Sequence, residues 1–261
     1  MEKNIIMDSI VPVRKEPNEQ SEMVTQLLFG ELYIVLSEKN GWSNIKGDFD
    51  NYEGFIDNKF IFQLSPAALR EFEIADKIIT LSPVNELLEL NSNTLFFIPS
   101  GCVIRRPEKG NVFSIGKKEF KYVNGENKPF IKENRDFVIS MAEKYINSPY
   151  LWGGRTHFGI DCSGLAQMVY KIAGYSLFRD AHQQARQGSE VNKPEDSVPG
   201  DLLFFEKNKN KISHVGIYLG AGDIIHGSGR VRKDKVDKNG ILTEKDNDYS
   251  HYLTIIRRII V

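Results

Sequence analysis

The chain has 261 residues, and its 34 Lys and Arg side chains almost balance its 35 Asp and Glu side chains, giving a net charge of −1. Hydrophobic residues make up 41% and charged residues 26% of the chain, which is typical of a folded globular protein and excludes a disordered one. The near-neutral charge argues against a nucleic-acid-binding protein that relies on phosphate contacts. Two cysteines, Cys102 and Cys162, exclude a disulfide scaffold and a four-cysteine zinc site.

Charge is distributed unevenly along the chain. Residues 1–127 carry a net charge of −5 and residues 128–261 a net charge of +4, which suggests two units with different roles. Residues 1–8 hold no apolar run of the length found in a signal peptide. The longest apolar stretches, such as residues 95–98, are too short to span a bilayer. We therefore expect a cytoplasmic protein that does not bind membranes or nucleic acid. An exported protein whose signal segment has been removed is the alternative.

Residues 1–64 show the pattern of a small β-barrel. Residues 27–36 are strand-like, with Gly30 in the middle to turn or kink the chain. Asn40-Gly41 is a turn signal that leads into alternating polar and apolar residues from Trp42 onward. With a further strand at residues 52–56, this density of short strands predicts a first barrel domain.

Residues 65–127 are also rich in predicted strands. A polar, potentially helical connector covers residues 65–76 and precedes strands at 94–99, 102–104, 111–115 and 118–123. We expect a second, degenerate barrel domain here. A single irregular β domain over both stretches is the alternative.

Residues 128–261 change to helices followed by strands. Apolar residues recur at helical spacing over 137–146, with Asn134 as a cap and Pro149 as a stop. A second helix begins at Cys162 and ends at Gly174. Strands follow at 201–206, 214–219, 223–226 and 252–260. This order predicts an α+β fold with an antiparallel sheet.

Cys162 is the first candidate for chemistry, because it stands at the predicted start of a helix. A helix N-terminus favours negative charge, so we expect it to lower the pKa of the thiol. The unpaired amides there also suit an oxyanion. The alternative is a buried structural cysteine, which is the role we assign to Cys102.

His214 and His226 flank a predicted hairpin. If residue n pairs with residue 440 − n, the two histidines lie directly opposite each other on one face of the sheet. One can then act as a base toward Cys162 and the other can fix its tautomer. A zinc site made of Cys162, His214 and His226 is the alternative. The remaining histidines show no partner pattern, and we expect surface or structural roles for them (His157, His182 and His251).

Several motifs in residues 134–261 resemble the NlpC-type cysteine peptidases, which are papain-like enzymes that cut bacterial cell-wall peptides. The nucleophile motif is Asp-Cys-Ser-Gly at 161–164, preceded by Pro-Tyr-Leu-Trp-Gly-Gly at 149–154. The strand motif Pro-Gly-Asp-Leu-Leu-Phe-Phe at 199–205 and Ser-His-Val-Gly-Ile-Tyr at 213–218 follow in the family's order, with His226 as the third member. The resemblance implies a papain-like catalytic domain over 128–261.

The N-terminal half resembles bacterial SH3 domains, through Gln-Leu-Leu-Phe-Gly-Glu at 26–31, Gly-Trp at 41–42 and Tyr-Glu-Gly-Phe at 52–55. Two such domains before an NlpC-type domain resemble the γ-D-glutamyl-L-diamino acid endopeptidases. That subgroup cuts murein stem peptides, L-Ala-γ-D-Glu-diamino acid, when the N-terminal alanine is free, in cell-wall peptide recycling. The expected partner is therefore such a peptide.

The resemblance also implies roles for individual residues. Asp180 holds the alanine ammonium, although Ala181 replaces a serine often found in the subgroup. Tyr52 contacts substrate from the first barrel, and Glu22 adds a second carboxylate. The alternative for Asp180 is an ion pair with Arg179 or another neighbour.

Four more residues complete the expected site. Tyr150 lines the nucleophile and helps to hold the oxyanion, and Trp152 shapes the pocket or is part of the core. Ser163 and Ser213 contact substrate, with helix capping as the alternative for Ser163. We expect no metal or cofactor and a monomer. A less selective wall endopeptidase and a non-catalytic wall-peptide binding module are the alternative functions.

Overall fold

The structure is a computed structural model that describes residues 3–206, 211–242 and 248–261. The chain divides into two compact units, Met1–Ile131 and Lys132–Val261. This division is coarser than the three expected domains, whose boundaries after residues 64 and 127 stay predictions. Within the described residues, no helix has both the length and the apolar character needed to cross a membrane.

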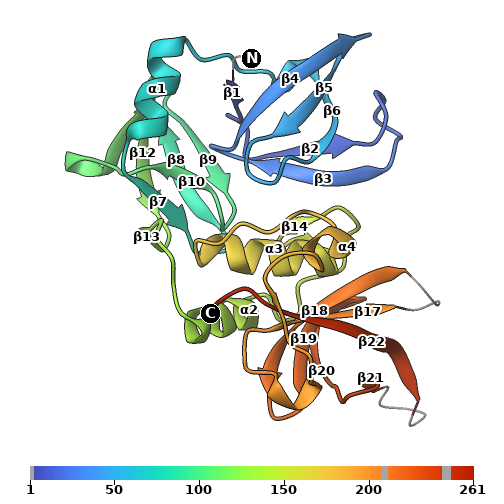
Figure 1. The fold of residues 1–261 in the computed structure, drawn as a ribbon. Coiled ribbons are helices and arrows are strands. Elements are labelled where there is room, and N and C mark those ends of the chain that lie inside the picture. The colour runs from blue at the N-terminus through green and yellow to red at the C-terminus, as the bar shows by residue number, and fades with distance from the viewer. Residues whose placement is uncertain (1–2, 207–210, 243–247) are drawn as a thin grey trace. The chain divides into compact units, whose positions relative to one another are not determined.

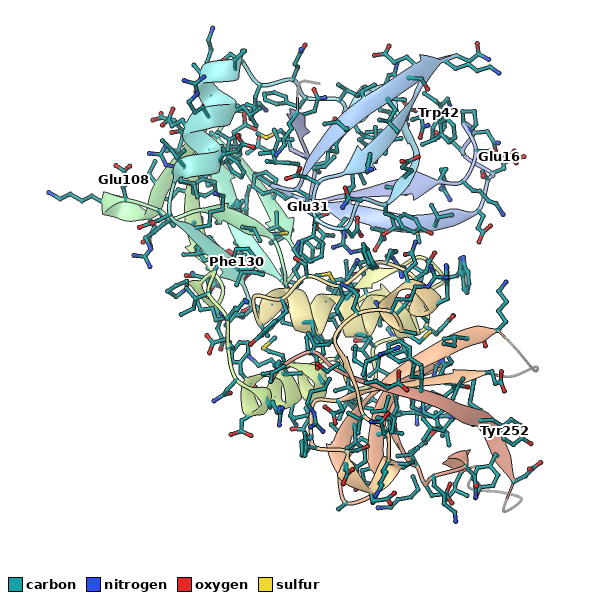
Figure 2. All side chains as sticks on the ribbon, viewed as in Figure 1. Glu16, Glu31, Trp42, Glu108, Phe130 and Tyr252 are labelled. Atoms are coloured by element: carbon teal, nitrogen blue, oxygen red, sulfur yellow. The ribbon has the colours of Figure 1, made fainter. Side chains whose placement is uncertain are left out.

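The first part of the N-terminal unit is a six-stranded antiparallel sheet in the order β1-β4-β5-β6-β2-β3 (Figure 1). Gly30, with φ of 84°, separates two strands, so the strand-like stretch at 27–36 comprises the end of β3, a turn at 29–31 and the start of β4. Asn40 and Gly41, with φ of 52° and 80°, form the expected hairpin turn before Trp42 (Figure 2). The strands are β1 (Lys3–Ile5), β2 (Ile10–Arg14), β3 (Met23–Leu28), β4 (Leu32–Lys39), β5 (Trp42–Gly47) and β6 (Glu53–Asp57), followed by the 3₁₀ turn η1 (Asn58–Phe60).

The rest of this unit contains one helix and two smaller sheets. Helix α1 (Pro66–Ile74) is capped by Ser65, as the polar connector suggested. The sheets have the orders β10-β7-β13 and β11-β12-β8-β9, and Phe29, in the turn after β3, packs against Phe96 and Phe120 of the four-stranded sheet. Three of the strands, β7, β8 and β13, were not expected. The elements are β7 (Lys77–Thr80), β8 (Asn85–Glu89), β9 (Thr94–Ile98), β10 (Val103–Arg105), η2 (Lys109–Asn111), β11 (Val112–Ile115), β12 (Lys118–Asn124) and β13 (Asn127–Pro129).

The C-terminal unit packs its helices against a curved antiparallel sheet in the order β16-β22-β17-β18-β19-β20, with β21 paired to β22. Asn134 caps α2, and Gly174, with φ of 83°, follows the end of α3. Figure 1 shows α2 and α3 beside this sheet, and α3 contacts both β18 and β19. The confirmed α+β layout thus places the start of α3 against the middle of the sheet.

The elements of this unit are α2 (Arg135–Lys144), β14 (Arg155–Thr156), β15 (Gly159–Ile160), α3 (Cys162–Ile172), α4 (Ala181–Gln184), β16 (Ser189–Glu190), η3 (Pro194–Asp196), β17 (Leu202–Glu206), β18 (Ile212–Gly220), β19 (Asp223–Ser228), β20 (Arg230–Lys235), β21 (Gly240–Leu242) and β22 (Tyr249–Arg258). A bridge between Val236 and Ile241 brings the chain after β20 to β21, so the sheet curls around its inner face. Six buried side chains fill that face: Leu203, Phe205, Ile224, Val236, Ile241 and Ile256.

Candidate active site

Cys162 is the first residue of α3, as the sequence predicted. The carboxylate of Asp161 caps the helix by accepting a hydrogen bond from the Gly164 N–H at 2.6 Å. The thiol sulfur receives hydrogen bonds from the backbone N–H groups of Val215 and Ser163. Gly227 allows β19 to approach the start of α3, because a Cβ at this residue would lie 3.3 Å from the Cys162 nitrogen. The sulfur therefore lies where α3 meets β18, beside the residue that follows His214.

The protonation of Cys162 differs from the expectation. Burial, aided by the negative charge of Asp161, raises the pKa of the thiol to about 12, against the two N–H groups and Arg179, which lower it. The Ser163 N–H at the helix start does lower this pKa, but the net shift is upward, so the predicted net lowering of the pKa of Cys162 is wrong. The side chain is only 7% exposed, and desolvation of the thiolate outweighs the helix-terminal amides. The thiol is protonated at rest and requires a base.

The two histidines meet, but in a different register from the expected one. Nε2 of His214 lies 2.7 Å from Nδ1 of His226. The β18–β19 ladder pairs His226 with Gly216, so the expected pairing of His214 with His226 is wrong by two residues. A shift of two residues keeps both side chains on the same face. Gly216 leaves the space between them, because a Cβ there would lie 3.1 Å from the Cβ of His226.

Two further polar residues, which the sequence analysis missed, extend this pair along β20. Nε2 of His226 lies 2.9 Å from Oδ2 of Asp234, and Nε of Arg232 donates to the same oxygen at 2.9 Å. The one signal in the sequence was that Arg232 and Asp234 are two positions apart in a charged stretch, which places both side chains on the same face of a strand. The result is a hydrogen-bonded chain of His214, His226, Asp234 and Arg232 across three adjacent strands.

His251 on β22 is also part of this cluster. Its ring stacks on that of His214, with centroids 4.3 Å apart and an interplanar angle of 27°. The expected surface or structural role of His251 did not include this contact, which depends on a strand distant in sequence. Burial, followed by the neighbouring His226, His251 and Arg232, lowers the pKa of His214 well below its ordinary value. His214 is therefore neutral and able to accept a proton.

The zinc alternative finds no support in this geometry. Both ring nitrogens of His226 are engaged, one by His214 and one by Asp234, which leaves no lone pair for a metal ion. Across the three described segments, no group of three or more His, Cys, Asp or Glu side chains is arranged to hold a metal.

A second buried network surrounds the start of α3. Arg179 is 1% exposed and meets Asp161 through NH1 at 3.0 Å from Oδ1 and NH2 at 2.6 Å from Oδ2. The hydroxyl of Ser163 donates to Asp161 and accepts from Arg179. The sequence analysis assigned no role to Arg179 beyond a possible partner for Asp180, whereas the structure gives it a buried partner at the nucleophile helix. Ser163 thus contributes its N–H to the thiol and its hydroxyl to this network.

Two aromatic residues precede α3 in the chain. Burial, followed by the negative charges of Cys162 and Asp161, raises the pKa of Tyr150, so its phenol stays protonated and can donate a hydrogen bond. Trp152 is 59% exposed, which excludes the alternative that it is a core residue. Both therefore remain candidates for contacts with a ligand.

The other expected site residues are spread over the chain. Asp180 begins α4, and Gln184 at the end of that helix donates to the Ser163 carbonyl at 3.0 Å, which ties α4 to α3. Ser213 is exposed on β18. Tyr52 and Glu22 belong to the N-terminal unit, where Glu22 pairs with Lys15 at 3.2 Å. Their contacts with substrate stay predictions.

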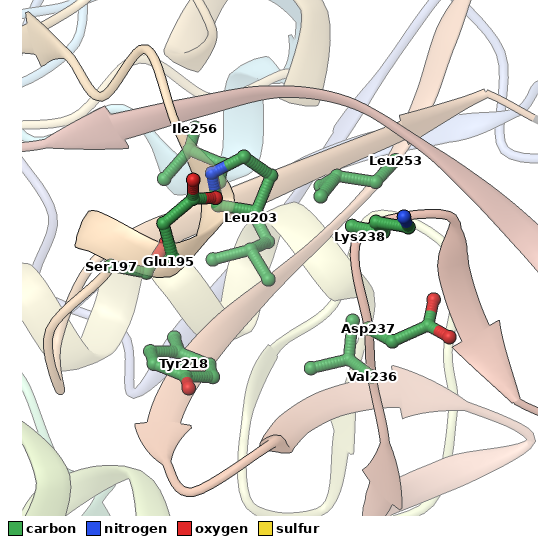
Figure 3. A pocket seen from close by; sticks show the side chains of 10 residues that line it. Glu195, Ser197, Leu203, Tyr218, Val236, Asp237, Lys238, Leu253 and Ile256 are labelled. Atoms are coloured by element: carbon green, nitrogen blue, oxygen red, sulfur yellow. The ribbon is translucent and has the colours of Figure 1, made fainter.

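A pocket of about 420 Å³ also opens in the C-terminal unit, between η3 and the inner face of the sheet (Figure 3). Its apolar floor includes Leu203, Tyr218 and Leu253, and Glu195 and Lys238 lie at its edge. Among the described residues, its lining includes none of the expected site residues. This pocket is therefore separate from the thiol.

Comparisons with known proteins match both halves of the chain to known families. Residues 147–248 match the NlpC/P60 family, and residues 13–60 match the bacterial dipeptidyl-peptidase Sh3 domain. The chain is 39% identical to a γ-D-glutamyl-L-lysine dipeptidyl-peptidase of Bacillus cereus over 79% of this chain and 67% of that protein. It is 29% identical to the protein of the same name from Bacillus subtilis over 90% of this chain and 80% of that protein.

The fold is likewise shared with a solved structure. An NlpC/P60 family protein from Bacillus cereus superposes with a TM-score of 0.83 at 20% identity, covering 99% of both chains. Motif order, fold and matched relatives lead to one assignment: the chain belongs to the NlpC/P60 family of cysteine peptidases.

Proposed function

We propose that this peptidase hydrolyses the bond between γ-D-glutamate and the diamino acid in murein peptides whose N-terminal L-alanine is free. The observation that carries the proposal is the position of Asp180, which caps the start of α4. Gln184, in the same helix, hydrogen bonds to the Ser163 carbonyl and so connects α4 to the helix that begins at Cys162. A carboxylate held near the nucleophile suits a substrate with an ammonium group a short distance from the cleaved bond. The names of the two Bacillus relatives support the same substrate class.

The reaction begins with proton transfer from Cys162 to His214. Nε2 of His214 is hydrogen-bonded to His226, so Nδ1 is the nitrogen that accepts this proton. The thiolate sulfur attacks the γ-glutamyl carbonyl carbon and forms a tetrahedral intermediate. Backbone N–H groups at the start of α3 and the protonated phenol of Tyr150 stabilise its oxyanion.

Collapse of the intermediate breaks the carbon–nitrogen bond. Protonated His214 gives its proton to the leaving amine of the diamino acid, and a thioester remains on Cys162. His214 then removes a proton from water, and the hydroxide attacks the thioester carbonyl and breaks the carbon–sulfur bond. The γ-glutamyl acid leaves, and protonated His214 returns its proton to the thiolate of Cys162. His226 holds His214 in one orientation throughout this cycle.

Selectivity follows from groups that read the N-terminus of the peptide. Asp180 pairs with the alanine ammonium. Trp152 and Ser213 contact the peptide near the nucleophile. An ammonium blocked by acetylation loses the ion pair and leaves a carboxylate without a cationic partner.

The decisive experiment compares L-Ala-γ-D-Glu-diaminopimelate with its N-acetylated form. We expect a loss of kcat/KM of at least about 100-fold on acetylation, the scale of losing a charged hydrogen bond of about 3 kcal/mol. Asp180→Asn should reduce this discrimination, whereas Asp196→Asn on the exposed turn η3 should leave it unchanged. Equal cleavage of both peptides by the unchanged enzyme would refute the proposal.

A less selective wall endopeptidase is the second candidate. The chain is 36% identical over 40% of its length to a probable endopeptidase p60 of Listeria monocytogenes. Cleavage of intact peptidoglycan and of the acetylated peptide at similar rates would favour this function.

A recycling role implies that enzyme and peptide meet in the cytoplasm. We separately propose that the enzyme is active as a monomer. Assay of cell fractions for the peptidase tests the location. Size-exclusion chromatography with light scattering tests the monomer.

A further inference from the structure

The hydrogen bonds of the histidine pair do not end at His226. His226 is fully buried on β19, and its Nε2 atom lies 2.9 Å from Asp234 Oδ2 on the next strand. Arg232 donates to the same oxygen from a side chain that is 42% exposed. The carboxylate therefore connects a buried imidazole to a cation at the protein surface.

We propose that Asp234 is a positioning residue that fixes the tautomer of His226 and balances the charge of Arg232, and so sets how readily His214 accepts the proton of Cys162. A carboxylate accepts but does not donate, so His226 must carry its hydrogen on Nε2. In the neutral ring of His226, Nδ1 is then an acceptor, and the hydrogen bond at 2.7 Å comes from Nε2–H of His214. Nδ1 of His214 is left as the basic nitrogen. One carboxylate thus orients every hydrogen bond of the chain.

The charge of Asp234 has a second effect. Burial opposes its ionisation, but the hydrogen bonds from His226 and Arg232 outweigh burial and lower its pKa, so the carboxylate is charged at working pH. Arg232 is among the groups that make His214 less basic. The groups around His214 and His226 are Asp234 and Arg232 on β20, His251 on β22 and Cys162 on α3. Among Asp234, Arg232 and His251, only Asp234 carries a negative charge.

The test uses two single variants and their combination. Asp234→Asn keeps an oxygen that accepts from Arg232 and His226 but removes the charge. Removing a negative charge lowers the pKa of every neighbouring group, so both limbs of the kcat/KM–pH profile should move to lower pH. At pH 7 we expect a loss of up to about tenfold, because a His214 that is one pKa unit less basic takes the thiol proton less readily. Arg232→Met should move both limbs in the opposite direction, and the double variant should recover part of the loss.

A tautomer readout separates positioning from simple stability. Nitrogen-15 NMR of the histidine rings should show a single Nε2–H tautomer of His226 in the unchanged protein and in Asp234→Asn. Asp234→Leu, which has no acceptor, should give mixed tautomers and a loss of about 100-fold, the upper range for removing a group that orients an active residue. Asp223→Asn is the matched control, because Asp223 lies on the neighbouring strand and pairs with Lys235 at 2.6 Å.

The inference rests on the proposed peptidase reaction, so one readout must not need the murein peptide. The rate of Cys162 alkylation by iodoacetamide across pH provides it, and it should move with the same sign in each variant. An enzyme that leaves murein peptides intact but shows these alkylation shifts would refute the proposed substrate and retain the role of Asp234. Unchanged pH limbs and alkylation rates in Asp234→Asn, or a single Nε2–H tautomer of His226 in Asp234→Leu, with folding confirmed by circular dichroism, would overturn that role.

Discussion

Arg179 and Asp161 form a buried ion pair through two parallel hydrogen bonds, at 3.0 and 2.6 Å. Asp161 is the residue directly before Cys162. The same carboxylate accepts from the backbone N–H groups of Gly153 and Gly164. One side chain thus joins the loop that carries Trp152, the start of α3 and the segment that leads to α4. Such a pair contributes more to a fixed geometry than to net stability, because desolvation offsets most of the attraction.

Loss of the Arg179 guanidinium should therefore damage both folding and catalysis. We expect Arg179→Met to lower the free energy of unfolding by about 3–5 kcal/mol, since it leaves Asp161 charged and buried. Arg179→Lys should retain more stability but lose the two-pronged contact, with kcat/KM reduced at least about tenfold. Chemical denaturation and steady-state kinetics measure these effects. Arg186→Lys, an exposed replacement, is the control, and equal behaviour of the two lysine variants would contradict the prediction.

Gly216 should be intolerant of any side chain. An added Cβ would lie 2.5 Å from Ile224 Cδ1 and 3.1 Å from the Cβ of His226, so Ile224 must shift and His226 must give way. We expect Gly216→Ala to cost about 1–3 kcal/mol of stability and to lower kcat more than KM, because substrate contacts are untouched. Gly47→Ala, in a strand of the other unit, is the control. A variant with unchanged kcat would show that the space at residue 216 is not needed.

The thiol of Cys162 should react slowly with iodoacetamide at neutral pH. Burial raises its pKa to about 12, so the thiolate is a minor species in the absence of substrate. The alkylation rate should increase with pH well beyond pH 9, and it should be absent in Cys162→Ala, because Cys102 is fully buried. Labelling at pH 7 that is faster than that of free cysteine would show instead that the resting thiol is ionised.

His157 should make the C-terminal unit sensitive to acid. Its ring stacks on Tyr145 with centroids 3.7 Å apart, and burial, followed by Lys144, lowers its pKa to about 4. Between pH 6.5 and 4 the unfolded chain binds a proton at this residue that the folded chain does not, so stability falls as pH falls through that window. The free energy of unfolding should fall by about 1–3 kcal/mol over this pH window because of His157.

His157→Phe keeps the stack and removes the titration. Thermal melts at pH 7 and pH 4.5 should show a smaller acid-induced decrease in Tm for this variant than for the unchanged protein. His182→Phe, at an exposed position on α4, should not change the decrease. Equal decreases in all three proteins would mean that other groups control acid stability.

The sequence by itself determined the local features of this protein. Helical spacing, a cap at Asn134 and a stop at Gly174 defined both long helices of the C-terminal unit, and Cys162 was placed at a helix start. Alternation put His214 and His226 on one face of a hairpin. These features depend on neighbours within a few positions, where backbone periods of 3.6 and 2 residues apply.

Only the tertiary structure decided how distant segments meet. The β18–β19 ladder, with an irregularity between Tyr218 and Gly220, pairs His226 with Gly216, two residues from the expected partner, and a difference of two residues leaves no trace in the alternating pattern. Curling of the sheet brought His251 onto His214, and burial of Arg179 gave Asp161 its partner. Burial in the packed unit also reversed the expected effect on the pKa of Cys162, because desolvation depends on everything that surrounds the thiol and not on its place in a helix.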